Sequence, residues 1–267
     1  MTYQPPRPDA AAVELMSFAR LRKLNDHLTQ RGDFHVLAVV ETGKGRVTVD
    51  FATHQLSPRT VVWISPGAVH RWDDIAEVDG HIALFVPTAV VTETTRRIVA
   101  SPDIAPLWEV ASGTWPYVEA ALAHLLLEAG APRNDVLTEL PKILLSALIA
   151  RLCPPRMTPV DTDGTFESFR QAVEASFRMH RDVGYYAHEL GYASRTLTRA
   201  VQRATGATAK RYIVERVVLE AKRLLAHDHL PSARVAAELG FPDASNFSLF
   251  FRAAVGMPPR AWQAAAG

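Results

Sequence analysis

One short phrase occurs twice in the last third of this 267-residue chain. The stretch "AHELGYASRTLTR" begins at Ala187, and "AAELGFPDASNFSLFFR" begins at Ala236. In each copy a short apolar segment ends at a glycine, Gly191 or Gly240, and a second segment of helical periodicity follows after a few residues. Glycine favours the left-handed backbone conformation that ends a helix. Because helix, glycine-containing turn and helix make a helix-turn-helix unit, the repeat predicts two such units.

The second helix of each unit is expected to have a buried stripe and an outward face. Leu197 and Val201 form the stripe in the first copy, and phenylalanines form it in the second. On the outward face, arginine can bond to guanine and asparagine to adenine in the major groove of DNA. The predicted DNA-reading residues are Arg195, Thr196, Thr198 and Arg199 in the first helix, and Ala244, Ser245, Asn246 and Leu249 in the second.

The rest of the C-terminal region also has helical patterning. The longest candidate helix, 209–226, lies between the two units, and Thr208 is placed to cap its start. Its charged residues Lys210, Arg211, Lys222 and Arg223 are expected to lie in solvent, with contact between one or two of them and phosphate as the alternative. The other candidate helices span 166–180, 183–190, 194–205, 233–239, 244–254 and 259–265.

Charge is distributed unevenly along the chain. The net charge is +1, but lysine and arginine outnumber the acidic residues after residue 164, whereas the acidic residues are in excess before it. A basic region joined to an acidic one indicates an anionic partner for one domain only. Together with the arginine-bearing outward face, this predicts double-stranded DNA as the partner of residues 165–267.

The segment "RLCPPRMTPVDTDG" separates two regions of different character. Proline lacks an N–H and restricts the residue before it, so this stretch should not be helical. A chain of this length is expected to hold two domains. We therefore predict a first domain over residues 1–150, a linker over 151–164 and a DNA-binding domain over 165–267.

Short strands dominate the first hundred residues. The stretch "FHVLAVVETGKGRVTVDF" has an apolar run, a Gly-Lys-Gly tip and then alternation, with Val47, Val49 and Phe51 on one face. This pattern predicts a β-hairpin with one buried face. Short strands with closely spaced turns indicate a small β-barrel or a β-sandwich. The expected fold class is two-domain α+β, with a small barrel and helices before an all-α domain.

Two apolar helices are expected between Tyr117 and Leu152, in "YVEAALAHLLLEAG" and "ELPKILLSALIARL". Their apolar surface is larger than the surface needed to cover one small barrel. The excess predicts a homodimer interface, and a charge placed at Leu144 or Leu148 is then expected to give monomers.

Residues 165–267 resemble the DNA-binding domain of the AraC family of bacterial transcriptional regulators. The resemblance rests on "YYAHELGYASRTLTRAVQRATGATAKRYIVERVVLEAKRLLA" and "VAAELGFPDASNFSLFFRAAVGMPPRAW". It implies that the two units place their reading helices in successive major grooves on one face of the DNA. Two residues depart from the family pattern. Ala193 replaces a usual capping serine, so that Ser194 must cap or the helix start is weaker, and Leu249 replaces a polar or basic reader.

The stretch "FHVLAVVETGKGRVTVDFATHQLSPRTVVWISPGAVHRW" resembles the cupin-type sensor domain often fused to this DNA-binding domain. The resemblance implies that residues 1–150 form an effector-sensing and dimerisation domain. The mouth of its barrel would bind a small-molecule effector, and the helices that follow would pair two subunits. The predicted effector-binding residues are Arg46, Trp63, His70 and Trp72. The same tryptophans could equally be ordinary core or rim residues.

A metal site is not expected in the barrel. Cupin enzymes hold their metal with closely spaced histidines, an acid and a later histidine, but the predicted barrel region has only His70 at a matching place and no His-x-His. Three converging ligands would require His35, His70 and His81 to meet across strands. The predicted site therefore has no metal, no cofactor and no catalytic residue. The alternative kept open is a metal-dependent cupin enzyme that carries a DNA-binding domain.

Several other classes are disfavoured by the sequence. No apolar run is long enough to span a bilayer, the N-terminus is not patterned as a secretory signal, and the single Cys153 fits a reducing cytoplasm. Cys153 is interpreted as a bystander thiol. The expected partners are double-stranded DNA, an unidentified effector and a second copy of the chain, with RNA polymerase as a further candidate. An architectural protein that binds DNA without sequence preference is a third possibility.

Overall fold

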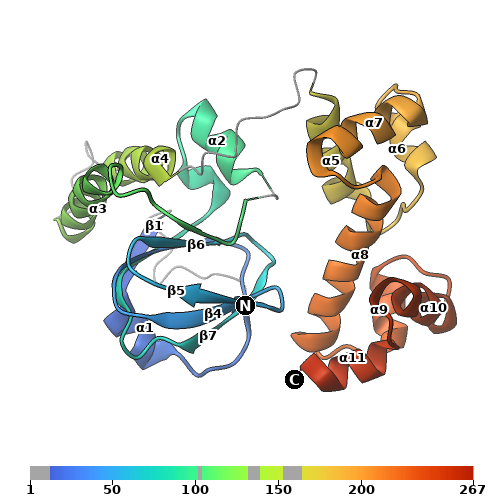
Figure 1. The fold of residues 1–267 in the computed structure, drawn as a ribbon, viewed down its shortest axis with the longest axis horizontal. Coiled ribbons are helices and arrows are strands. Elements are labelled where there is room, and N and C mark those ends of the chain that lie inside the picture. Colours follow the sequence, from blue (N-terminus) through green and yellow to red (C-terminus); the bar gives the residue numbers. More distant parts are fainter. Residues whose placement is uncertain (1–12, 102–103, 132–138, 153–163, 267) are drawn as a thin grey trace. The chain divides into compact units, whose positions relative to one another are not determined.

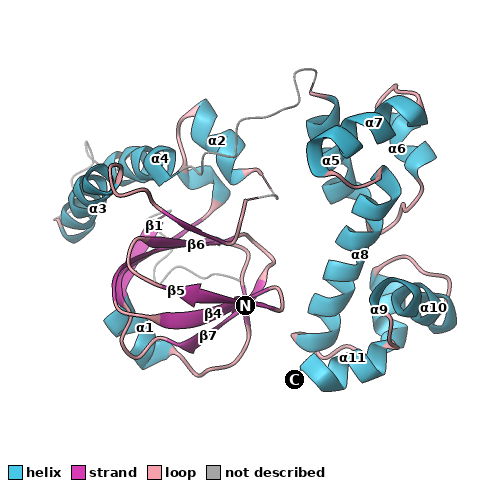
Figure 2. Cartoon of the chain, in the orientation of Figure 1, coloured by secondary structure: helices cyan, strands magenta, loops and turns pink. Residues whose placement is uncertain are grey.

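The computed structural model describes residues 13–101, 104–131, 139–152 and 164–266. The chain divides into two compact units, Met1–Met157 and Thr158–Gly267. Within the described residues, strands occur in the first unit and the second unit is built from helices (Figure 2). The two-domain α+β prediction is therefore confirmed. Most of the predicted linker, including Cys153, lies outside the described residues. No helix of the described residues is long and apolar enough to cross a membrane.

The strands of the first unit form two antiparallel sheets (Figure 1). The larger sheet has the order β1-β8-β3-β6-β9, with bounds Val13–Ser17, Asp79–Phe85, His35–Thr42, Thr60–Ile64 and Leu107–Glu109. The smaller sheet has the order β2-β7-β4-β5, with bounds Gln30–Arg31, Val69–Asp74, Gly45–Val49 and Ala52–Leu56.

Both faces of the larger sheet are buried, and this explains the apolar run in β3. Val36 and Ala38 point into the core between the two sheets, together with Trp72 and with Phe18 of α1 (Phe18–Leu24). Leu37 and its alternate neighbours pack on the opposite face, under the helices. A strand that is covered on both faces has no polar side, so its sequence does not alternate.

The predicted hairpin between β3 and β4 is wrong, because these two strands belong to different sheets. Gly43 has φ +84°, and a Cβ added there would meet the Glu77 carbonyl oxygen at 1.8 Å. The glycines of the tip therefore let the chain cross between the sheets at close range. The hairpin that forms joins β4 to β5 through Asp50 and Phe51, whose φ values are 46° and 71°. Two positive φ values are the geometry that matches the twist of a tight hairpin.

Helices cover the outer face of the larger sheet. They are the 3₁₀ turn η1 (Pro87–Ala89) and the helices α2 (Glu93–Val99), α3 (Trp115–Gly130) and α4 (Leu140–Leu152). The Leu148 side chain is 0% exposed and belongs to the core shared with the sheet. The expectation that a charge at Leu148 reports on dimerisation is therefore wrong, since that charge would damage the fold. Leu144 is only partly buried. The exposed large apolar residues of α3 and α4 are Tyr117, Leu127 and Ile143.

The second unit follows the predicted helix pattern closely. Its helices are α5 (Thr165–Ser176), α6 (Val183–Glu189), α7 (Ser194–Thr205), α8 (Ala209–Ala226), α9 (Ser232–Glu238), α10 (Ala244–Val255) and α11 (Pro259–Ala266). The bounds of α7 and α8 are those predicted. Thr208 caps α8 as expected, because its hydroxyl accepts from the Arg211 N–H at 3.2 Å. One apolar core joins α5, α6, α7, α8, α9 and α10. Figure 1 shows α6 and α7 at one end of α8, with α9 and α10 at the other.

Candidate nucleic-acid interface

The two helix-turn-helix units have turns of the same construction. The glycine that ends each first helix has a left-handed backbone, with φ of 70° and 63°. In the first turn the Tyr192 N–H donates to the Ala187 carbonyl at 2.8 Å. In the second turn the Phe241 N–H donates to the Ala236 carbonyl, also at 2.8 Å. The repeated phrase in the sequence therefore encodes the same turn twice, as predicted.

The second helix of each unit is anchored by its apolar stripe. In α7 the side chains of Leu197 and Val201 are fully buried, and in α10 those of Phe247 and Phe251 are. Phe250, which the sequence also assigned to the stripe, is only partly buried. Because one side of each helix is fixed in the core, the opposite side faces solvent at a defined rotation.

In α7 the predicted reading residues lie on the solvent side. Arg195, Thr196 and Arg199 are exposed, and Thr198 is half-buried. Within the described part of the chain, no ion pair or hydrogen bond engages the guanidinium of Arg195 or Arg199. Two guanidinium groups without a carboxylate partner are available to an anionic or base-edge acceptor.

In α10 the predicted reading residues are less polar and more constrained. Ser245, Asn246 and Leu249 are exposed, with Leu249 at 69%, and Ala244 is half-buried. The Asn246 side-chain amide donates to the Asp243 carboxylate at 2.9 Å, so its orientation is held before any ligand arrives.

The starts of α7 and α10 differ. Asp243 caps α10, because its carboxylate accepts from the Asn246 N–H at 2.8 Å. This bond, together with the one from the side chain, lowers the pKa of Asp243. Ala193 occupies the same place before α7 and offers no side-chain bond, and Ser194 is already the first helical residue. Ser194 therefore does not cap α7, and of the two expected alternatives the weaker helix start holds. Aspartate just before a helix is a known start signal, so the role of Asp243 could have been found from the sequence.

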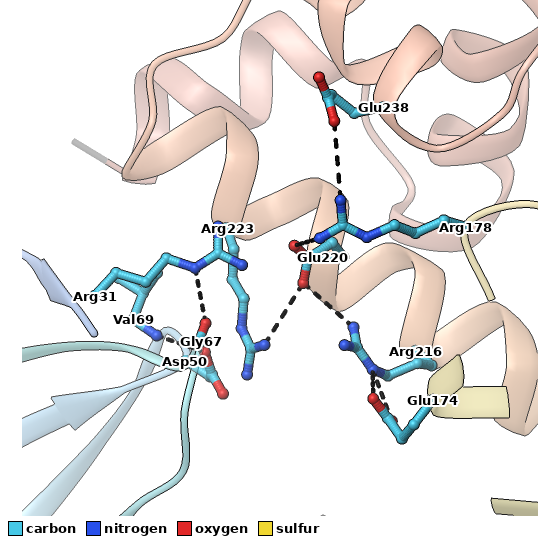
Figure 3. Close-up of polar contacts among 10 residues, drawn as sticks. All are labelled: Arg31, Asp50, Gly67, Val69, Glu174, Arg178, Arg216, Glu220, Arg223 and Glu238. Atoms are coloured by element: carbon cyan, nitrogen blue, oxygen red, sulfur yellow. Dashed lines mark hydrogen bonds and ion pairs between the residues drawn. The ribbon is translucent and has the colours of Figure 1, made fainter. Parts of the chain in front are cut away.

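A charged network that the sequence did not predict surrounds Glu220 on α8 (Figure 3). Glu220 is 1% exposed, and its carboxylate lies 3.0 Å from Arg178, 3.4 Å from Arg216 and 3.6 Å from Arg223. Arg223 is itself buried, so the expectation that it lies in solvent is wrong. A buried carboxylate needs such partners, because an unpaired charge in the core is costly.

The four predicted effector-binding residues of the first unit do not converge. Trp72 lies in the core between the sheets, and His70 is buried beside it, with ring centroids 6.2 Å apart. Trp63 lies on the other face of the larger sheet, in the core under the helices. Arg46 is exposed on β4. The structure thus brings His70 and Trp72 together and separates the other two residues from them.

The three histidines considered for a metal do not meet either. His35 and His81 lie on strands of the larger sheet and His70 on the smaller one. The His81 ring pairs with Glu41, 2.7 Å away. Among the described residues, no group of three histidine, cysteine or acidic side chains could hold a metal ion.

Two family models match this chain, one in each unit. The AraC-like ligand binding domain matches residues 22–89, and a helix-turn-helix domain matches residues 186–265. The second match covers both helix-turn-helix units described above, apart from the first three residues of α6. The chain thus joins an AraC-like ligand binding domain to a helix-turn-helix domain.

Two curated relatives match most of this chain. It is 23% identical to the HTH-type transcriptional activator RhaR of Cronobacter sakazakii over 86% of this chain and 84% of the relative. It is 24% identical to the HTH-type transcriptional activator RhaS of Pectobacterium atrosepticum over 85% and 84%. The structure of ToxT from Vibrio cholerae is also similar, with 11% identity, a TM-score of 0.44 and coverage of 94% of this chain and 97% of that one.

Proposed function

We propose that this chain is a sequence-specific regulator of transcription of the AraC family. The observation that carries the proposal is the pair of turn-matched units, whose α7 and α10 present solvent-facing polar side chains. Arg195 and Arg199 on α7 can each bond a guanine in bidentate fashion. The relatives named as transcriptional activators support regulation of transcription as the outcome of binding. RNA polymerase remains a candidate partner on the same ground.

The two reading helices are proposed to contribute unequally. At the place in α10 equivalent to Arg199 stands Leu249, which can touch a thymine methyl but donates no hydrogen bond. Asn246 is the residue of α10 suited to adenine. The preferred site should therefore have one strongly selected box with G·C pairs. A looser box richer in A·T should lie about one helical turn away, roughly 10 base pairs.

Selection from randomised DNA by the full-length protein tests this proposal. Arg199→Ala should lose the preference at one G·C pair, because a good bidentate contact contributes about 1–3 kcal/mol of discrimination. Leu249→Ala should leave the strong box unchanged. Arg211→Ala is the matched control, since this exposed arginine lies on α8 and pairs with Glu215.

Two outcomes would count against the proposal. Binding that shows no selected site, and that falls steeply with salt for every sequence, would indicate a phosphate-only architectural protein. Loss of the strong box on Leu249→Ala, to the same degree as on Arg199→Ala, would contradict the assignment of α7 as the main reader.

The first unit is proposed to sense a small-molecule effector in the core between its sheets. The family match over residues 22–89 and the adjacent His70 and Trp72 support this location. A thermal-shift screen of small metabolites on the wild type and on His70→Asn tests it. A compound that stabilises the wild type but not the variant is the expected result. A compound that stabilises both equally would place the effector elsewhere.

A further inference from the structure

The connection between α5 and α6 leads into the first helix-turn-helix unit but contacts the turn of the second. The Arg181 guanidinium donates to the carbonyl oxygens of Leu239 and Gly240, and the second of these bonds is 2.9 Å long. The same guanidinium lies over the Phe241 ring, 4.0 Å from its centroid. One side chain therefore holds three consecutive residues of the second turn.

The backbone on both sides of this contact is close-fitting. A Cβ added to Gly240, where φ is +63°, would lie 2.6 Å from the carbonyl oxygen of Arg178. Any side chain at this position would push the connection away from the turn. The glycine that ends α9 thus also permits the two units to touch.

A second arginine of the same connection reinforces the contact (Figure 3). Arg178 pairs with Glu220 on α8 at 3.0 Å and with Glu238, the last residue of α9, at 3.8 Å. Arg178 and Arg181 together hold the end of α9 and the middle of α8. We name these two residues the arginine clamp.

The arginine clamp restricts the distance and the rotation between α7 and α10. The 18 residues of α8 span about 27 Å at 1.5 Å per residue, and the chain between α8 and α9 is a short non-helical stretch. Neighbouring major-groove segments lie about 34–36 Å apart, and each base pair adds about 36° of rotation. A unit that could pivot at the α8–α9 connection would accept several spacings, whereas a clamped one accepts a single spacing.

We infer that Arg181 is a positioning residue that sets the spacing at which α7 and α10 read DNA together. The inference rests on the proposed function. Arg181 itself lies in the connection between α5 and α6, contacts the turn of the second unit and has no assigned contact with a base. Its removal should therefore relax the dependence on spacing without changing which bases are preferred within each box.

The test uses the full-length protein and the two boxes found by selection, placed at the native spacing and at one or two base pairs more or less. The wild type should prefer the native spacing strongly. In Arg181→Ala the ratio of affinities between native and shifted sites should fall about tenfold, the size expected when charge-assisted hydrogen bonds are lost. Arg181→Lys keeps the charge but not the planar fork and should give an intermediate ratio. The control Arg211→Ala should keep the wild-type ratio.

The possible outcomes distinguish a failure of this inference from a failure of the proposed function. An equal loss of affinity at every spacing in Arg181→Ala, or a wild type indifferent to spacing, overturns the inference while the selected boxes still support the function. A wild type that selects no boxes overturns both. Should Arg181→Ala fail to fold, Arg181→Gln retains part of the hydrogen bonding, and an unchanged spacing ratio in that folded variant would also overturn the inference.

Discussion

At the scale of single residues, the core histidine His35 has a measurable consequence. It is 2% exposed, its ring stacks on Phe85 at 5.0 Å, and burial lowers its pKa from 6.5 to about 4. Between pH 6.5 and 4 the His35 imidazole is protonated in the unfolded chain but not in the folded chain. The free energy of unfolding therefore falls as the pH falls toward 4. At about 1.36 kcal/mol per pH unit, the loss is on the order of 3 kcal/mol.

Replacing His35 with phenylalanine removes this titration and should flatten the profile. Urea unfolding of both proteins at pH 7, 6 and 5, followed by tryptophan fluorescence, measures the difference. His188→Asn, at an exposed position on α6, is the control and should follow the wild type. The same pH slope in His35→Phe and the wild type would show that His35 does not cause the loss.

At the scale of elements, α3 and α4 are proposed to form a homodimer interface. Leu127 is 74% exposed and Tyr117 58%, whereas Leu148 is completely buried against the larger sheet. Leu127→Glu should yield a folded monomer, because the charge enters the interface and not the core. Leu148→Glu should lower the melting temperature sharply, because it buries a charge without a partner.

Sedimentation velocity at micromolar concentration, with circular dichroism to follow folding, distinguishes these effects. Lys142→Ala, a polar position on α4, is the control and should remain dimeric. A wild type that sediments as a monomer would refute the proposed dimer.

At the scale of the whole molecule, each unit has its own core, and both reading helices lie in the second. Residues 165–267 alone should therefore select the same bases as the full chain. Their affinity for DNA should be lower by about 100-fold or more. A dimer binds two DNA sites, and binding at the first site raises the effective concentration for binding at the second. Selection and affinity measurements on fragment and full chain test this, with the fragment carrying Arg199→Ala as a control for specific binding. A fragment that folds but selects different bases would contradict the proposed boundary.

The sequence alone determined the second unit in detail. The bounds of α7 and α8, the two matched turns and the cap at Thr208 all followed from local patterns. Apolar spacing, glycine at a helix end and a capping hydroxyl act within a few residues, so a single sequence contains them. The exposed positions of Arg195 and Arg199 then followed from the buried positions of Leu197 and Val201 on the same helix.

Only the tertiary structure decided the pairing of strands and the contacts between distant segments. The run in β3 is apolar on both faces, so its residues did not reveal which strand it pairs with or which side carries Trp63. The Glu220 network and the reach of Arg181 to Gly240 join residues far apart in the chain. Such contacts form because folding brings separate elements together, and no local pattern of charge or hydropathy encodes that arrangement.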